Sequence, residues 1–398
     1  MRKHLLFGAL ALSTQITFAQ TVTNAPESKY EFTKVVQLDA TPVESQGMTG
    51  TCWSFSSLSF FESELIRLGH KNPAELSEMY IVRKAYEAKA DRFIRMDGKI
   101  NFSEGGAFHD IPYVIKRYGI VPRSVYTGLT NGKTTYNHEE LFAVLNSFMQ
   151  TVLAEVQKGK GIGTEWKKAF SSLLDAYLGP DITEFTLDGK KYTPVSYAAS
   201  LGLKMNDYVS ITSFSNDPFY ESCEIAIPDN WAWGDSYNVP LEDLVSVAEN
   251  ALKNGYTLAW GADVSEKGFN FRQGIAIYPE DESTIQIRGK DNKSFNDAGA
   301  AKTSNAFLEP VKELVITQEK RQEEYDGKTT TDDHGMHIVG LYKDQNGTRY
   351  FLVKNSWGTD NLPQGFLYVS ENYFRMKTIN IYLDKNGLAK ELKNKLKI

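Results

Sequence analysis

The sequence predicts an α+β protein in which a helical lobe comes first and a β lobe follows. Amphipathic helical patterns dominate the chain up to about residue 181. From about residue 182 the pattern changes to short runs that are typical of strands. Helices first and strands second is the order expected of an α+β protein. With 398 residues, 41% of them hydrophobic, the chain is long enough to bury a sizeable core.

The chain starts with a segment that is typical of an export signal. Residues 2–4 are basic, residues 5–18 are mostly apolar, and Ala19 ends a triplet with a small residue at each end. The apolar run is too short to span a bilayer, so no membrane anchor is expected. We therefore expect a Sec signal peptide over residues 1–19, cleaved after Ala19, and a periplasmic or extracellular protein.

Charge and cysteine content bound the function further. The formal net charge is −6, and Lys and Arg are spread out without a long basic stripe, so nucleic-acid binding is not expected. Only Cys52 and Cys223 are present, which does not suggest a disulfide framework. We expect Cys52 to stay free because of its surroundings, and Cys223 to be a small buried hydrophobic residue.

Periodicity predicts the elements of each lobe in order. After an N-terminal arm over residues 20–40, the helical lobe (about 41–181) is expected to hold helices at 52–69, 75–93 and 107–118, a Gly-rich loop at 101–106, and one or two helices within 137–178. The β lobe (about 182–386) is expected to hold strands at 208–214, 257–263, 337–343, 350–354, 365–369 and 379–383, with a helix at 241–253. A Lys-rich tail over 387–398 is expected to form a short helix.

Cys52 is the candidate nucleophile. The apolar residues that follow it recur at steps of three and four until Gly69, which places Cys52 at the N-terminus of a helix. A helix N-terminus and an adjacent imidazolium both lower the pKa of a cysteine, so we expect a reactive thiolate. Gly47 and Gly50 allow the backbone to turn tightly just before it.

The base must come from elsewhere in the chain, and His334 and His337 are the candidates. The turn at 344–347 predicts a hairpin that starts near these histidines and ends at Asn355, so an imidazole is expected beside a carboxamide. The carboxamide oxygen would fix the ring tautomer and leave the other nitrogen for the thiol. Successive strand residues face opposite ways, so only one histidine can face the cleft. Strand parity groups His334 with Met336 and Ile338, and His337 with Val339 and Leu341; it does not choose between the two.

Four short motifs resemble those of the papain family of cysteine peptidases. They are Gln46-Gly47 followed by Gly50-x-Cys52-Trp53-Ser54-Phe55, the pair Gly105-Gly106, His334 six positions before Gly340, and Asn355-Ser356-Trp357-Gly358. The spacing to Gly340 resembles that of the family's catalytic histidine, and it selects His334 over His337. The resemblance implies a papain-like two-lobe fold, with the nucleophile on the helical lobe and the histidine and asparagine on the β lobe.

The resemblance also implies a role for each residue. Cys52 would be the nucleophile, His334 its base and Asn355 the residue that orients the base. The Gln46 side chain and the Cys52 backbone N–H would hold the oxyanion. No metal or cofactor is implied.

Substrate-binding roles are implied for three further residues. Trp357 would shield the hydrogen bond between histidine and asparagine from water. Gly105 and Gly106 resemble the family strand that pairs with the substrate backbone, where glycine allows close approach.

Over most of residues 41–386 the chain is similar to the bleomycin hydrolase and aminopeptidase C branch of this family. The similar segments are 75–80, 238–241, 260–263 and 370–385. This resemblance implies an aminopeptidase that acts on peptides, assembles as a homo-hexamer and places its C-terminal tail in the cleft. The tail here is short and Lys-rich, so an endopeptidase with an open cleft is the first alternative. A non-enzymatic papain-fold module that binds peptides is the second.

Overall fold

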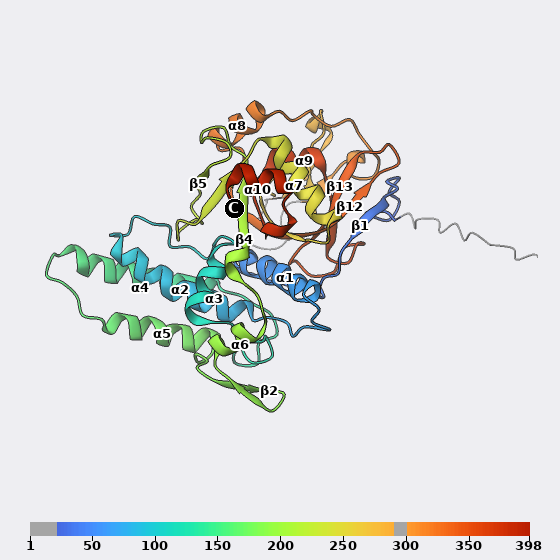
Figure 1. Cartoon of the computed structure of the whole chain (residues 1–398). Helices are drawn as coiled ribbons and strands as arrows, with labels where there is room; N and C mark the ends of the chain where they lie inside the picture. The colour runs from blue at the N-terminus through green and yellow to red at the C-terminus, as the bar shows by residue number, and fades with distance from the viewer. Residues whose placement is uncertain (1–21, 290–300) are drawn as a thin grey trace, which may run out of the picture.

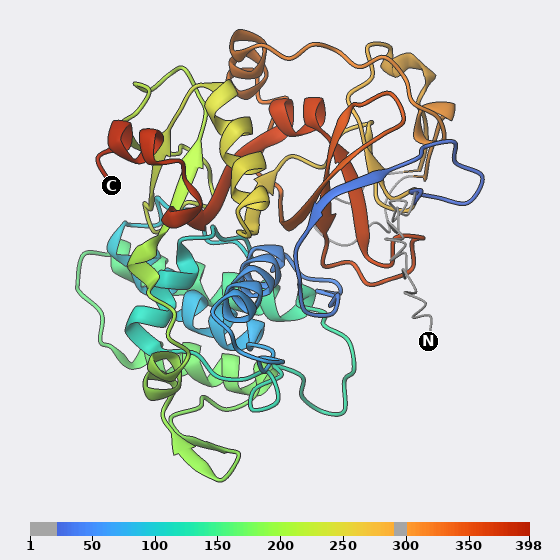
Figure 2. The same ribbon diagram turned by 45° about the vertical axis from the view of Figure 1, so that its right-hand side comes forward.

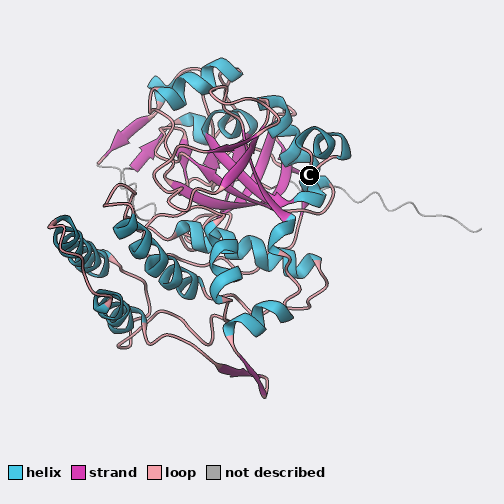
Figure 3. Ribbon diagram, turned by 60° about the vertical axis from the view of Figure 1, so that its left-hand side comes forward, coloured by secondary structure: helices cyan, strands magenta, loops and turns pink. Residues whose placement is uncertain are grey.

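The structure is a computed structural model that describes residues 22–289 and 301–398 (Figure 1). The predicted signal peptide, residues 1–19, lies outside the described residues. Helices gather in one lobe, and most strands gather in the other, where further helices cover the sheet (Figure 3). Within the described ranges, none of the helices has the length and apolar character needed to cross a bilayer.

The helical lobe is built from the first six helices, which enclose an aromatic-rich core. They are α1 (Cys52–Arg67), α2 (Glu78–Arg95), α3 (Asp110–Tyr118), α4 (Glu139–Gln157), α5 (Glu165–Leu178) and α6 (Pro194–Ser200). The small hairpin of β2 (Phe185–Leu187) and β3 (Lys190–Tyr192) projects from this lobe. The predicted helices before residue 181 are thus present, within a few residues of their expected ends.

The β lobe is built around one large mixed sheet. Its strands lie in the order β5 (Ser222–Glu224), β6 (Asp235–Asn238), β4 (Tyr208–Thr212), β15 (Thr378–Asp384), β7 (Leu258–Ala262), β12 (His334–Lys343), β13 (Arg349–Lys354), β14 (Phe366–Ser370), β9 (Ile275–Ala276) and β8 (Phe269–Asn270). Further elements are the pair β10 (Gln286–Arg288) and β11 (Ala301–Thr303), and helices α7 (Leu241–Lys253), α8 (Gln318–Asp326), α9 (Glu371–Lys377) and α10 (Lys390–Leu396). Each predicted strand is found, whereas α9 and the short outer strands carry too little pattern to be predicted.

The N-terminal arm is part of the β lobe rather than a polar extension. Strand β1 (Thr33–Gln37) pairs antiparallel with β12, and the segment before it folds back so that Val22 pairs with Phe32. Tyr30 and Phe32 are buried, and the Phe32 ring stacks on Tyr368 with ring centroids 3.9 Å apart. From residue 22 onward the expected N-terminal arm is therefore not a free extension, because aromatic burial draws it onto the sheet.

A β-bulge in β12 changes the strand parity expected from the sequence. The pairing of β12 with β13 shifts register between Ile338 and Gly340. Leu341 therefore packs in the same core as Met336 and Ile338. Grouping Leu341 with His337 by parity is wrong, because a bulge adds one residue and reverses the alternation beyond it. The bulge lies after both histidines, so the side chains of His334 and His337 still lie on opposite faces of β12.

Helix α1 lies at the boundary of the lobes and packs directly on β12 (Figure 2). The face of α1 that meets the β lobe carries small polar residues: Ser56, Ser59 and Ser63. The Ser59 hydroxyl bonds His337 Nδ1 at 2.9 Å. Gly335 packs so closely that a Cβ there would lie 2.8 Å from the Ser56 hydroxyl and 3.4 Å from the Cα of Trp53. The absence of a side chain at Gly335 thus sets how closely the two lobes approach.

We expect Gly335→Ala to lower the free energy of unfolding by about 1–3 kcal/mol, the usual cost of overpacking a tight core. The added Cβ would press on Ser56 and lie 3.3 Å from the Phe108 ring. Urea denaturation measures the effect. The matched control is Gly163→Ala, in an exposed loop where the new Cβ meets only the end of the Glu165 side chain. Equal stability of the two variants would contradict the account.

Candidate active site

Cys52 is the first residue of α1, and the turn before it is held by specific contacts. Gly47 has φ of +60°, and a Cβ there would lie 2.4 Å from the Tyr136 carbonyl oxygen. Only glycine satisfies both conditions. The Gly50 backbone N–H donates to the Glu104 carboxylate at 2.8 Å. The glycine turn predicted before the cysteine is therefore present, and it is tied to the helical lobe.

His334 and Asn355 are joined as the hairpin argument predicts. His334 begins β12, and Asn355 directly follows the end of β13. His334 Nε2 lies 2.7 Å from Asn355 Oδ1, and this oxygen also accepts the Ser356 backbone N–H at 2.8 Å. Because the amide oxygen is the acceptor, Nε2 carries the ring proton and Nδ1 keeps its lone pair. The imidazole is thus set to accept a proton at Nδ1.

His337 lies on the other side of the strand. It is fully buried, with Nδ1 on the Ser59 hydroxyl, and Ser59 also accepts from the Lys354 ammonium at 2.7 Å. It does not line the cavity that holds Cys52. The structure therefore places His334, and not His337, with the cysteine.

Gln46 is held in a fixed orientation next to the asparagine segment. Its Oε1 accepts from the Ser356 hydroxyl at 2.6 Å, and its Nε2 donates to the Thr49 carbonyl at 2.7 Å. The backbone N–H of Gln46 also donates to the Ser356 carbonyl at 2.9 Å. One N–H of the side-chain amide is left for another acceptor.

Trp357 covers the imidazole. Its ring centroid lies 4.6 Å from that of His334, and Phe269 and Phe271 pack against it edge-on. A ring in this place withholds water from the His334–Asn355 bond, as the resemblance implies. Trp357 does not itself line the cavity, so the structure gives no support for direct contact with substrate.

Gly105 and Gly106 lie in a loop that lines the cavity and not in a strand. A Cβ on Gly105 would lie 1.9 Å from Asp229 Oδ2, and one on Gly106 would lie 2.7 Å from Asp110 Oδ2 and 2.9 Å from the Trp53 ring. Glycine is required at both positions because the protein's own side chains pack there. Contact with the substrate backbone stays a prediction.

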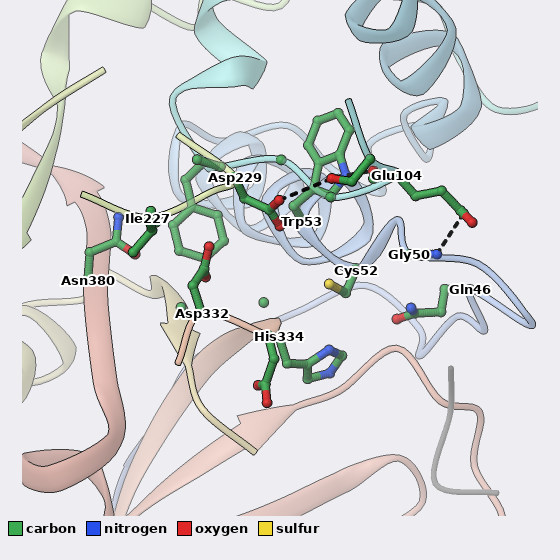
Figure 4. Close-up of a pocket in the computed structure, with 18 of the residues that line it drawn as sticks. Gln46, Gly50, Cys52, Trp53, Glu104, Ile227, Asp229, Asp332, His334 and Asn380 are labelled. Carbon is green, nitrogen blue, oxygen red and sulfur yellow. Dashed lines mark hydrogen bonds between the residues drawn. The ribbon is translucent and has the colours of Figure 1, made fainter. Parts of the chain in front are cut away.

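One cavity of about 330 Å³ between the lobes brings the predicted residues together (Figure 4). Cys52, His334, Gln46 and both glycines line it. The cavity is also lined by four acidic residues that were not predicted from the sequence: Glu104, Asp229, Asp332 and Asp333. They come from three loops far apart in the chain, so no local pattern marks them. The only available signal was that Asp332 and Asp333 directly precede His334.

Burial dominates the electrostatics of the thiol. Desolvation, with a smaller contribution from the charges of Asp229 and Asp332, raises the pKa of the Cys52 thiol to about 12. Backbone N–H groups of Gly335 and Trp53 act in the opposite direction but do not outweigh burial. The prediction of a lowered thiol pKa is therefore wrong for the resting site.

Burial acts on the base as well. Desolvation lowers the pKa of His334 to about 4, against the hydrogen bond to Asn355, which raises it. Burial therefore opposes the adjacent imidazolium expected from the sequence. Within the described residues no hydrogen bond joins the thiol to the imidazole. Burial thus disfavours a lone thiolate and a lone imidazolium alike, and the proton passes between the two groups when the thiol attacks.

The other cysteine and the tail lie away from the cavity. Both cysteines are free, as expected for Cys52. Cys223 is only partly buried, on the outer strand β5, so its assignment as a buried hydrophobic residue holds in part. Helix α10 packs on the β lobe through Leu392 and Leu396, and none of residues 387–398 lines the cavity. The short tail helix is confirmed, but this arrangement differs from the implied position of the tail in the cleft.

Relatives of known sequence cover nearly the whole chain. It is 24% identical over 394 residues to Aminopeptidase G of Lactobacillus delbrueckii subsp. lactis, which covers 89% of this chain and 83% of that protein. It is 22% identical over 405 residues to Aminopeptidase C of Lactococcus lactis subsp. lactis (strain IL1403), with 92% and 85% covered.

A solved structure shares the fold. The structure of PepW from Lactobacillus rhamnosis HN001 matches with a TM-score of 0.68 at 19% identity, covering 92% of this chain and 84% of that one. The predicted papain-like, two-lobe α+β fold is confirmed. The sequence model of the Peptidase C1-like family matches residues 3–170 and 291–398. The chain belongs to the Peptidase C1-like family.

Proposed function

We propose that this protein is a cysteine aminopeptidase that releases N-terminal residues from peptides. The observation that carries the proposal is the cavity that Cys52, His334 and Gln46 line together, with His334 bonded to Asn355 behind it. The names of its relatives, Aminopeptidase G and Aminopeptidase C, support the aminopeptidase activity. Family membership and this set of side chains speak against a non-enzymatic peptide-binding module.

The geometry supports acyl transfer through a thioester. Cys52 Sγ attacks the scissile carbonyl carbon while its proton passes to His334 Nδ1. The free N–H of the Gln46 amide and the Cys52 backbone N–H stabilise the oxyanion. The C–N bond then breaks as His334 gives the proton to the leaving amine. Water, deprotonated by His334, attacks the thioester and releases the N-terminal residue as its carboxylate, which restores the thiol.

The resting charges explain why the two groups must act as a pair. A lone thiolate in this buried site is costly, as the raised pKa of Cys52 shows, and so is a lone imidazolium at His334. Transfer of the proton creates both charges side by side, and each then stabilises the other. Asn355 assists because its oxygen accepts from Nε2–H and favours the charged ring.

We expect His334→Ala to lower kcat/KM by about 10²–10⁴-fold, because the variant loses its general acid and base. His337→Gln should keep kcat/KM close to that of the unchanged protein, since His337 lies outside the cavity. Steady-state hydrolysis of free-amine peptides, with Cys52→Ala as the inactive reference, measures both. Loss of turnover in His337→Gln with His334→Ala active would reverse the assignment.

Comparing free and N-acetylated forms of the same peptides tests the aminopeptidase activity. We expect hydrolysis of the free form at its first peptide bond and slow hydrolysis of the acetylated form. The position of residues 387–398 outside the cavity is the observation that favours the alternative, an endopeptidase with an open cleft. Internal cleavage of acetylated peptides at the rate of the free ones would establish that alternative.

The reactivity of the thiol should depend on the acidic residues of the cavity. The negative charge of Asp332 raises the pKa of Cys52, so Asp332→Asn should lower that pKa and extend alkylation by iodoacetamide to lower pH. Site-resolved mass spectrometry across a pH series measures this while excluding Cys223. Asp235→Asn, which removes an exposed carboxylate outside the cavity, should leave the profile unchanged. A shift to higher pH in Asp332→Asn would contradict the sign.

We also propose that residues 1–19 are a signal peptide and that the protein works outside the cytoplasm. The basic start, the apolar run and Ala19 support this. Expression in a bacterial host with an active Sec pathway should give a periplasmic or secreted protein that begins at Gln20 by N-terminal sequencing. Replacing Ala19 with a bulky residue should block processing. An unprocessed protein in the cytoplasm would rule the proposal out.

A further inference from the structure

An aminopeptidase must hold the positively charged N-terminus of its substrate. An ammonium group that leaves water needs anionic or strongly polar acceptors to replace its hydration. This requirement, which rests on the proposed function, directs attention to the carboxylates that share the cavity with Cys52. That a peptide enters this cavity follows from the thiol and the imidazole, and it does not depend on those carboxylates.

The C-terminal segment does not supply the acceptor in this structure. Leu388, Leu392 and Leu396 are buried in the core of the β lobe, and the Lys395 ammonium lies over the Tyr220 ring. The backbone N–H of Ile398 donates to the Lys393 carbonyl. These contacts hold α10 against the outer part of the lobe, beside α7 and β4 (Figure 1).

Two of the four cavity carboxylates already have partners. Glu104 accepts the Gly50 backbone N–H at 2.8 Å and thereby supports the turn before Cys52. Asp333 accepts the Val264 backbone N–H at 2.9 Å through Oδ1, while its Oδ2 is buried without a hydrogen-bond partner, and burial and neighbouring Asp263 raise its pKa to about 8.

Asp229 and Asp332 have acceptor capacity to spare. Asp229 accepts from Asn101 and Ser103 only at Oδ1, at 3.2 and 3.3 Å, which leaves Oδ2 open. Asp332 has no hydrogen bond or ion pair with any residue that the structure describes. Burial and nearby carboxylates raise its pKa well above the usual range, so a bound cation would relieve an unfavourable charge.

Few positive charges are present in the cavity to balance its carboxylates. No Lys or Arg side chain from the described part of the chain lines it. The charge of Lys89 acts on Asp229, but the Lys89 ammonium donates to the carbonyls of Ser103 and Gly105 and does not line the cavity. The cavity is therefore suited to bind a positively charged group of the substrate.

Asp229 and Asp332 also lie at the end of the cavity where the amine of an N-terminal residue would lie. Figure 4 shows Asp229 and Asp332 on the side of Cys52 opposite to Gln46. Both charges act on the Cys52 thiol, so both lie within electrostatic reach of the reacting atoms. An extended residue spans ~3.3 Å, so the amine of a one-residue acyl group stays close to the thiol.

We propose that Asp229 and Asp332, from two loops that meet at this end of the cavity, form the receptor for the substrate's N-terminal ammonium. Asp332 supplies the unpartnered carboxylate, and Asp229 supplies its free Oδ2. The pair determines specificity and does not take part in bond breaking. It restricts the enzyme to free N-termini by attraction for the charged amine, without a contribution from residues 387–398.

The test compares an aminoacyl-7-amido-4-methylcoumarin with its N-acetyl derivative, using the full-length processed enzyme. Asp332→Asn and Asp229→Asn should each lower kcat/KM for the free-amine substrate by about 10- to 100-fold, the range for losing a hydrogen bond to a charged group. The rate on the acetylated substrate should stay the same or rise, so the preference for a free amine collapses. Asp332→Glu should recover part of it, and Asp235→Asn should keep it.

The outcomes separate this inference from the proposed function. If the unchanged enzyme prefers the free amine and both asparagine variants keep that preference, the receptor assignment is wrong while the aminopeptidase stands. If the unchanged enzyme has no such preference, the proposed function itself fails. Iodoacetamide labelling of Cys52 in each variant checks that the site is assembled, and an equal loss of rate on both substrates would mean a structural role and overturn the inference.

Discussion

The close approach of strand β12 to helix α1 at Gly335 is the constraint on which the site depends. Cys52 begins the helix and His334 begins the strand, so the packing of these two elements sets the distance between thiol and imidazole. A Cβ at Gly335 would meet Ser56, one turn after Cys52. Small residues at this contact allow the two lobes to approach closely, so that each contributes residues to the same site. The tight packing keeps the distance between the Cys52 thiol and the His334 imidazole constant.

A chain of hydrogen bonds then couples the groups that face the substrate. Ser356 binds the Gln46 side chain through its hydroxyl and the Asn355 oxygen through its backbone N–H, and Asn355 in turn orients His334. The oxyanion donor and the base are thus positioned by one short segment of the β lobe. The oxyanion donor and the base therefore stay aligned with each other.

The features of the site that depend on local sequence patterns could be predicted from the sequence. Helical periodicity places Cys52 at a helix start, and the turn at 344–347 brings His334 to Asn355. The choice between the histidines needed a family spacing, because Ser59 lies on the other lobe and the cavity forms only where the two lobes meet. The thiol pKa was predicted in the wrong direction, because burial arises only when the lobes close over the site. Asp229 and Asp332 escaped notice because distant loops bring them together only in the folded chain.

Mass spectrometry of the acid-quenched reaction with an activated aminoacyl ester tests the central claim most directly, since it detects the covalent intermediate itself. We expect an adduct of one aminoacyl group on the tryptic peptide that contains Cys52, and its accumulation when Gln46 and His334 are intact. Product formation without any adduct on Cys52, or an adduct on Cys223 instead, would contradict the account.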